Sequence, residues 1–115
     1  MLGRGVAPIA SGDADGVFRD VRHVVREADL AMVNLESPLT RRPHTAANPH
    51  ALEADPALAD LVAAAGFDVL SLANNHAGDA GRESIIDTVF AVKNAGMKGV
   101  GVGSDRADAL MPVFL

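Results

Sequence analysis

The chain has 115 residues, a length that accommodates one compact domain at most. Its 15 acidic and 10 basic residues give a net charge of −5, and the basic residues are scattered, which argues against a nucleic-acid partner. Because cysteine is absent, disulfides and thiolate metal sites are excluded, and any metal must be held by oxygen and imidazole ligands. No long apolar run follows a basic segment near the first residue, so the sequence predicts neither a signal peptide nor a membrane anchor.

The first elements predicted are a helix and a strand. Between residues 13 and 28, apolar side chains recur at helical spacing, and Asp13 or Asp15 is available to cap such a helix. The apolar run 29–35 that follows is too short for a helix and is apolar at consecutive positions, as in a strand buried on both faces. We therefore expect a central strand that ends near Glu36.

The next stretch predicts a long loop, a helix and a second strand. Residues 37–55 contain three prolines and little periodicity, which indicates an irregular loop of the length that often carries function. Pro56 suits the first turn of a helix, and Gly66 stands where a helix C-cap belongs. Residues 67–73 then read as the next strand.

The last third of the chain predicts a third helix, a third strand and a short helical turn. Asp79 is placed to cap the helix and Gly96 to stop it. Residues 97–102 form the predicted strand, and 105–110 the helical turn. Because helices and strands alternate along the chain, we expect right-handed βαβ crossovers and a parallel sheet, which is an α/β fold.

Polar side chains follow two of these strands at the point where each strand ends. Glu36 closes the first strand, and Asn74, Asn75 and His76 close the second. Ligands of open parallel sheets bind outside the carboxyl ends of the strands, so one βαβ unit places these four side chains on the same rim. A carboxylate, a carboxamide oxygen and an imidazole suit Mn²⁺, Zn²⁺ or Fe²⁺, and two such ions could activate a water and clamp a phosphoryl oxygen.

An ordinary structural interpretation fits the same residues. An Asn-Asn pair after a strand is typical of a turn followed by a helix cap, Glu36 could be a simple rim carboxylate, and His76 could be a solvated group at a helix entry. The other histidines add no obvious ligand, because His44 and His50 lie in the proline-rich loop and His23 lies on a predicted helix. The residues alone leave both interpretations open.

Three glycines near the end of the chain raise the question of a phosphate-binding loop. Gly99, Gly101 and Gly103 do not have the Gly-x-Gly-x-x-Gly spacing, and the first two lie within the predicted strand. We therefore favour close backbone packing at these positions. Ser104 or Asp105 is expected to cap the short helix that follows.

Five segments, taken together, resemble one known family. They are MLGRGV, ADLAMVNLESPL, AGFDVLSLANNHAGDAG, DTVFAVKNAG and GVGSDRADA, and they keep the family's order and spacing nearly end to end. On this pattern the chain resembles the CapA family, the poly-γ-glutamate capsule synthesis proteins of the calcineurin-like metallophosphoesterase superfamily. The resemblance implies parallel βαβ layers that form part of an αββα metallophosphoesterase domain.

The resemblance also implies roles for the residues of the rim. Glu36 matches the metal-ligand acid of the family's "NLE" segment, and the "NNH" segment is similar to the superfamily's Gly-Asn-His motif. Asn75 would then ligate a metal through its amide oxygen, and His76 would act as the catalytic residue that stabilises the phosphoryl group or protonates the leaving oxygen. Asn74 and Ser37 would contact the substrate. The implied cofactor is a pair of divalent ions (Mn, Fe or Zn) in the complete protein.

Departures from the family pattern predict that residues 1–115 are a partial domain. Family members have a strand ending in Gly-Asp before the MLGR segment and further histidine motifs later in the chain, and neither is present here. We therefore expect the domain to lack its first strand and its C-terminal half. With so few ligands, hydrolysis by this chain alone is not expected.

Three functions compete on these grounds. The chain could be part of a metal-dependent phosphoesterase-like enzyme or capsule-polymer accessory, a non-catalytic polymer- or partner-binding module, or an inactive truncated fragment. The expected partners are a capsule polymer or a phosphoester substrate, with possible association with other capsule-synthesis proteins. The compartment is left open, since complete family members are often membrane-anchored or exported.

Overall fold

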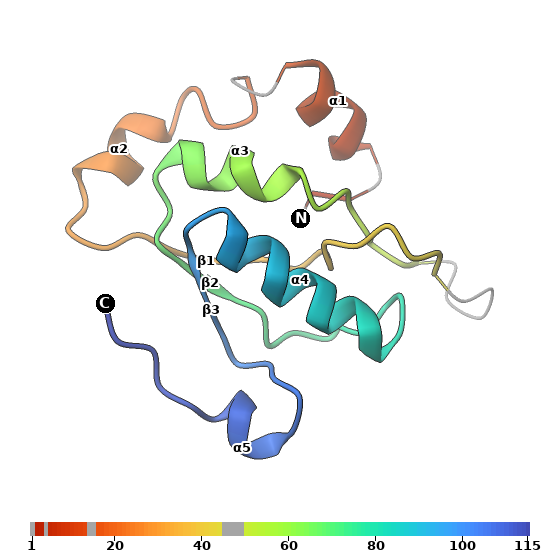
Figure 1. Ribbon diagram of the computed structural model, residues 1–115. Helices are drawn as coiled ribbons and strands as arrows, with labels where there is room; N and C mark the ends of the chain where they lie inside the picture. The colour runs from red at the N-terminus through yellow and green to blue at the C-terminus, as the bar shows by residue number, and fades with distance from the viewer. Residues whose placement is uncertain (1, 4, 14–15, 45–49) are drawn as a thin grey trace.

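The computed structural model describes residues 2–3, 5–13, 16–44 and 50–115. Helices and strands alternate along most of the described chain (Figure 1). In order they are α1 (Val6–Gly12), α2 (Arg22–Glu27), β1 (Met32–Asn34), α3 (Leu58–Ala65), β2 (Val69–Ser71), α4 (Arg82–Asn94), β3 (Lys98–Val100) and α5 (Arg106–Ala109).

The three strands form one parallel sheet in the order β1-β2-β3. The register aligns Val33 with Leu70, and Leu70 with Gly99. Helix α3 leads into β2 and α4 connects β2 to β3, and Figure 1 shows both helices on the same side of the sheet, as right-handed crossovers require. The predicted α/β fold with parallel βαβ connections is therefore confirmed.

The hydrophobic core lies between this face of the sheet and the helices. Leu70 in the central strand and Val92 in α4 are fully buried. Burial of each large aliphatic side chain stabilises the fold by about 1.5–3 kcal/mol. The same cluster includes the following buried residues: Leu35, Leu39, Leu58, Leu61, Val62, Leu72 and Met97.

Close packing explains Gly99 in β3 and the two glycines that follow this strand, as the sequence predicted. A Cβ atom added to Gly99 would lie 2.8 Å from Cδ1 of Leu72, and one added to Gly101 would lie 2.6 Å from Cβ of Ala73. Gly103 is equally crowded, because its added Cβ would lie 2.6 Å from the main-chain nitrogen of Ala109. These glycines let the backbone approach its neighbours closely.

Two predicted helix caps are also confirmed. Gly66 ends α3 in the left-handed conformation, with a φ of 106°. Asp105 begins α5, and its side-chain Oδ1 accepts a hydrogen bond of 2.9 Å from the amide of Asp108.

The long first helix predicted over residues 13–28 is wrong. Among the described residues of that stretch, only Arg22–Glu27 is helical, and residues 16–21 form turns. Asp13 caps no helix there, since its side chain closes a turn by accepting from the amide of Gly16, and Asp15 lies outside the described residues. Phe18 packs edge-to-face on Phe67 at a centroid distance of 5.7 Å, so tertiary contacts override the helical spacing.

The prediction of a first strand buried on both faces is also wrong. In the described sheet β1 is an edge strand, and β2 is the central one. Met32 at the start of β1 is 57% exposed, although the run 29–35 is apolar. The hydrophobic sequence did not reveal which strand has neighbours on both sides.

The irregular loop predicted over residues 37–55 is anchored at its base. Leu39 and Ala54 form an isolated parallel bridge, with hydrogen bonds of 2.9 Å from the amide of Thr40 to Ala54 and from the amide of Ala54 to Pro38. Leu39 is fully buried, and its amide donates to the hydroxyl of Thr88 on α4 at 2.8 Å. The base of the loop is therefore fixed against both the core and α4.

Across the described ranges, the helices are all too short or too polar to cross a lipid bilayer.

Candidate functional site

The side chain of Asn74 ties the end of β2 to the end of β1. Its Nδ2 donates to the main-chain carbonyl of Leu35 at 3.0 Å and to Oδ1 of Asn34 at 3.3 Å. Its Oδ1 accepts from the amide of His76 at 3.0 Å. Asn74 therefore shapes the turn after β2 and fixes it against the segment that leads to Glu36.

His76 is held by a buried carboxylate. Its Nδ1 lies 2.8 Å from Oδ2 of Asp79, whose side chain is only 6% exposed, whereas that of His76 is 23% exposed. The same Oδ2 accepts a hydrogen bond of 2.9 Å from the amide of Leu52 in the long loop. Asp79 thus joins the imidazole to the 37–55 loop.

The predicted role of Asp79 as a helix cap is wrong. Helix α4 begins at Arg82, its N-cap residue is Gly81, and no side chain caps it. The carboxylate is instead turned to His76 and Leu52. The sequence contained a usable signal, because an acid three residues after a histidine in a turn can reach the imidazole.

Glu36 and Asn75 follow the two strand ends that Asn74 connects. Glu36 is half-buried and Asn75 is exposed, and within the described ranges neither side chain makes a hydrogen bond or an ion pair. Their oxygen atoms are therefore available to a ligand. The geometry brings both to the same rim as His76, as the parallel topology predicted.

Carboxylate and amide oxygens with an imidazole have the right chemistry for a divalent transition-metal ion. Among the residues that the structure describes, however, no three His, Asp or Glu side chains group closely enough to hold a metal ion. The donors of the rim therefore fit part of a metal site, and metal binding by Glu36 and Asn75 stays a prediction.

Ser37, predicted to contact substrate, is fully buried. Its hydroxyl oxygen accepts hydrogen bonds from the amides of Leu2 at 2.9 Å and Gly3 at 3.0 Å. This arrangement fixes the start of the chain beside the rim. A substrate contact by Ser37 or Asn74 stays a prediction, and both side chains have clear structural tasks.

The pocket beneath the rim is too small for a substrate. It encloses about 10 Å³, which is room for about one water molecule. Its walls are formed mainly by apolar residues: Leu35, Pro38, Leu72, Ala77, Ile85, Thr88 and Val102. A substrate therefore cannot bind inside this pocket.

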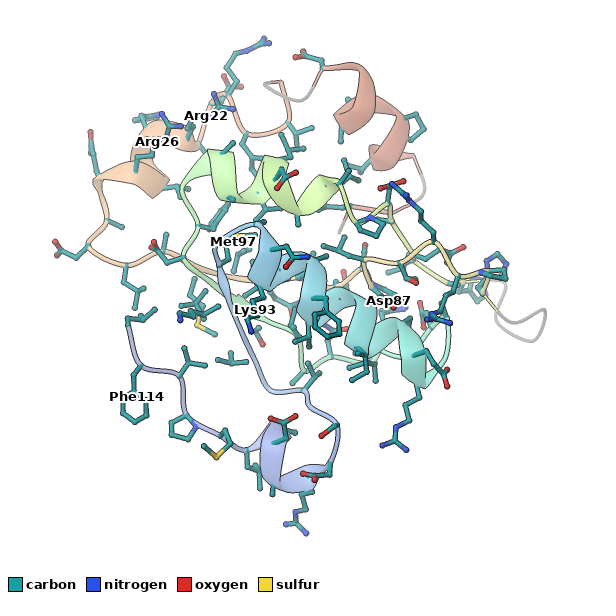
Figure 2. The ribbon with its side chains drawn as sticks, viewed as in Figure 1. Arg22, Arg26, Asp87, Lys93, Met97 and Phe114 are labelled. Atoms are coloured by element: carbon teal, nitrogen blue, oxygen red, sulfur yellow. The ribbon has the colours of Figure 1, made fainter. Side chains whose placement is uncertain are left out.

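Ion pairs fix the loop beside the rim. Asp87 on α4 lies on the side of the helix that meets the loop (Figure 2), and it binds Nε of Arg42 at 2.7 Å and the hydroxyl of Thr40 at 2.6 Å. The Arg42 guanidinium and then the Thr40 hydroxyl lower the pKa of Asp87. In the same way, hydrogen bonding to Arg41 lowers the pKa of Asp55.

The fold and the rim define an α/β domain with a polar site at the carboxyl ends of parallel strands. The chain belongs to the family described as bacterial capsule synthesis protein PGA_cap, whose model matches residues 1–115. The resemblance identified from the sequence motifs is therefore confirmed.

Curated relatives agree with this family. The chain is 34% identical to the capsule biosynthesis protein CapA of Bacillus anthracis over 99% of its own length and 29% of the relative. It is 30% identical to the PGA biosynthesis protein CapA of Bacillus subtilis (strain 168), over 95% of the chain and 30% of the relative. It is also 34% identical to a probable polyglutamine synthesis accessory protein of Mycobacterium tuberculosis, over 74% of the chain and 24% of the relative. The chain thus spans less than a third of the length of each.

Proposed function

We propose that this chain provides one side of a divalent-metal site in a capsule synthesis protein, with Glu36 and Asn75 as ligands and His76 as the catalytic imidazole. The observation that carries the proposal is the contact of Asn74 with Leu35, because it brings these three side chains to one rim. The free oxygens of Glu36 and Asn75 support it, since neither is used within the described structure.

The chemistry proposed for the complete protein is phosphoester hydrolysis or a related transfer on a phosphoryl group. Divalent cations bound at such a rim would polarise a phosphoryl oxygen and activate a water molecule. This chain would bind the cations through Glu36 and Asn75, and it would place the imidazole of His76 beside the reacting group. There His76 would stabilise the phosphoryl oxygens or give a proton to the leaving oxygen. With its partial ligand set, the isolated chain is expected to bind metal weakly and to show no turnover.

Paramagnetic broadening of NMR signals by Mn²⁺ tests the site directly, because it detects weak binding and needs no turnover. We expect the signals of Glu36, Asn75 and His76 to broaden first. Glu36→Gln removes the carboxylate charge and should abolish this pattern. Glu27→Gln is the matched control, since Glu27 is an exposed acid at the end of α2. Broadening that survives Glu36→Gln would contradict the proposed ligand set.

The capsule context comes from the names of the relatives, so we propose an acidic capsule polymer such as poly-γ-glutamate as the material on which the complete protein works. A chain of net charge −5 repels a polyanion unless cations bridge the two. Binding of poly-γ-glutamate is therefore expected to require Mn²⁺ and to be lost on chelation. Binding that persists in chelator would favour a non-catalytic binding module. Association with other capsule-synthesis proteins belongs to the same proposal.

A further inference from the structure

Two contacts fix His76, one to its backbone and one to its ring. The amide donates to Oδ1 of Asn74 at 3.0 Å, and Nδ1 of the ring lies 2.8 Å from Oδ2 of Asp79. Both partners come from the same turn between β2 and α4. Both direct contacts of His76 are therefore made within its own turn.

The chemistry of the Asp79 contact fixes the position of the ring proton. An ionised carboxylate can only accept hydrogen bonds, so the ring nitrogen that faces it must carry the hydrogen. In neutral His76 that nitrogen is Nδ1, and the lone pair is left on Nε2. A solvated histidine side chain prefers the opposite tautomer, with the proton on Nε2.

The burial of Asp79 also calls for an explanation. Burying a carboxylate is costly unless it is hydrogen-bonded. Oδ2 of the buried Asp79 accepts a hydrogen bond from the amide of Leu52, and the same oxygen faces Nδ1 of His76. It does not cap α4, whose N-cap residue is Gly81. Its described contacts are thus directed at the imidazole and the long loop.

We propose that Asp79 is the positioning residue of the rim: it holds neutral His76 in the Nδ1–H tautomer, so that Nε2 is the ring nitrogen left to exchange a proton with a substrate, and the same carboxylate accepts from Leu52 of the 37–55 loop. That Nε2 works on a substrate rests on the proposed function. The tautomer and the Leu52 contact are properties of the chain alone.

The tautomer is measured by ¹⁵N NMR of the histidine rings in the metal-free chain, at about pH 9, where imidazoles are generally neutral. We expect most His76 molecules to carry the proton on Nδ1. His23 is the internal control, because it is exposed on α2 and no hydrogen bond to its ring is found in the described ranges, so it should favour Nε2–H. Loss of one signal in His23→Gln assigns the control.

Two variants separate positioning from mere structural support. Asp79→Ala removes the acceptor and should shift most His76 molecules to Nε2–H. Asp79→Asn keeps an acceptor oxygen and should retain Nδ1–H. Amide hydrogen exchange at Leu52 should be about tenfold faster in Asp79→Ala, through loss of one hydrogen bond. In His76→Gln it should be unchanged, because the Asp79 contact to Leu52 remains.

A majority of Nε2–H in the unmodified chain would overturn the proposal, even if Asp79→Ala failed to fold. An unchanged Nδ1–H tautomer in a folded Asp79→Ala variant would overturn it as well. Because no metal or substrate is present, these results are independent of the Mn²⁺ experiment. The Mn²⁺ experiment can therefore contradict the proposed metal site while the NMR experiment confirms the tautomer. The opposite pair of results is equally possible.

Discussion

The side-chain amide of Asn74 donates to the main-chain carbonyl of Leu35 across the gap between the ends of two parallel strands. The two residues are 39 positions apart in the chain, so the contact closes a long connection at the rim. A glycine at this position could not make the bond. Asn74 thus shapes the turn after β2 and also links this turn to the end of β1, which a residue without a side-chain amide could not do.

Asn74→Ala should lower the free energy of unfolding by about 2 kcal/mol, because the bond to Leu35 and the bond from the amide of His76 are both lost. Asn34→Ala is the matched control. It removes only a longer, exposed contact and should cost less than about 0.5 kcal/mol. Urea denaturation measures both, and equal losses would contradict the role of Asn74 as a cross-link.

Ser37→Ala should also cost about 2 kcal/mol of folding stability, because two buried amides lose their acceptor. Ser104→Ala, at an exposed position, should change the stability by less than about 0.5 kcal/mol. Both values follow from denaturant titration. If Ser37→Ala were neutral, the contacts to Leu2 and Gly3 would contribute nothing, and a role in substrate binding would become the better explanation for Ser37.

Gly101→Ala should be strongly destabilising, by about 2–4 kcal/mol, for two reasons that add. Gly101 has a φ of 89°, which L-residues rarely adopt, and its added Cβ would meet that of Ala73. Gly5→Ala serves as the control, because Gly5 has helical dihedral angles and open space around its Cα. Thermal unfolding should show a large drop in Tm for the first variant only. Similar Tm values would show that the backbone at Gly101 relaxes without cost.

The Asp87 contacts predict an acid-sensitive loop attachment. Arg42 and Thr40 hold the pKa of Asp87 below its ordinary value of 3.8 in the folded chain. These contacts of Asp87 therefore contribute fully to folding stability above about pH 4. Their contribution is lost as the pH falls through the lowered pKa of Asp87 in the folded chain. The stability difference between the native chain and Asp87→Asn should shrink over this range. The effect should be small, and salt should weaken it, because Arg42 is exposed. A difference that does not vary with pH would contradict this assignment.

The local chemistry of the chain was predictable wherever it depended on neighbouring residues. Gly66 and Asp105 act as caps for reasons visible in a few positions of sequence. The shared rim followed from the alternation of helices and strands, because parallel strands end at one edge. The close packing of Gly101 could likewise be inferred from its place beside an apolar strand.

The errors in prediction arose where distant parts of the chain decide the outcome. Helical spacing over residues 13–28 could not show that Phe18 packs on Phe67 and leaves the helix to begin at Arg22. The exposure of Met32 depends on what covers its face of β1, which the pattern of apolar residues does not encode. Asp79 was assigned to the helix that follows it, whereas its Oδ2 bonds Leu52, 27 positions away.

The anchored base of the long loop has a consequence for how this protein could vary. The Leu39–Ala54 bridge and the Leu52–Asp79 bond fasten both arms of the loop close to the rim. In sequence, the positions between Arg42 and His50 lie between these two attachments, so insertions or deletions there should leave the spacing of the strand ends unchanged. A protease site or a fluorescent label could be introduced at these positions while the rim stays intact.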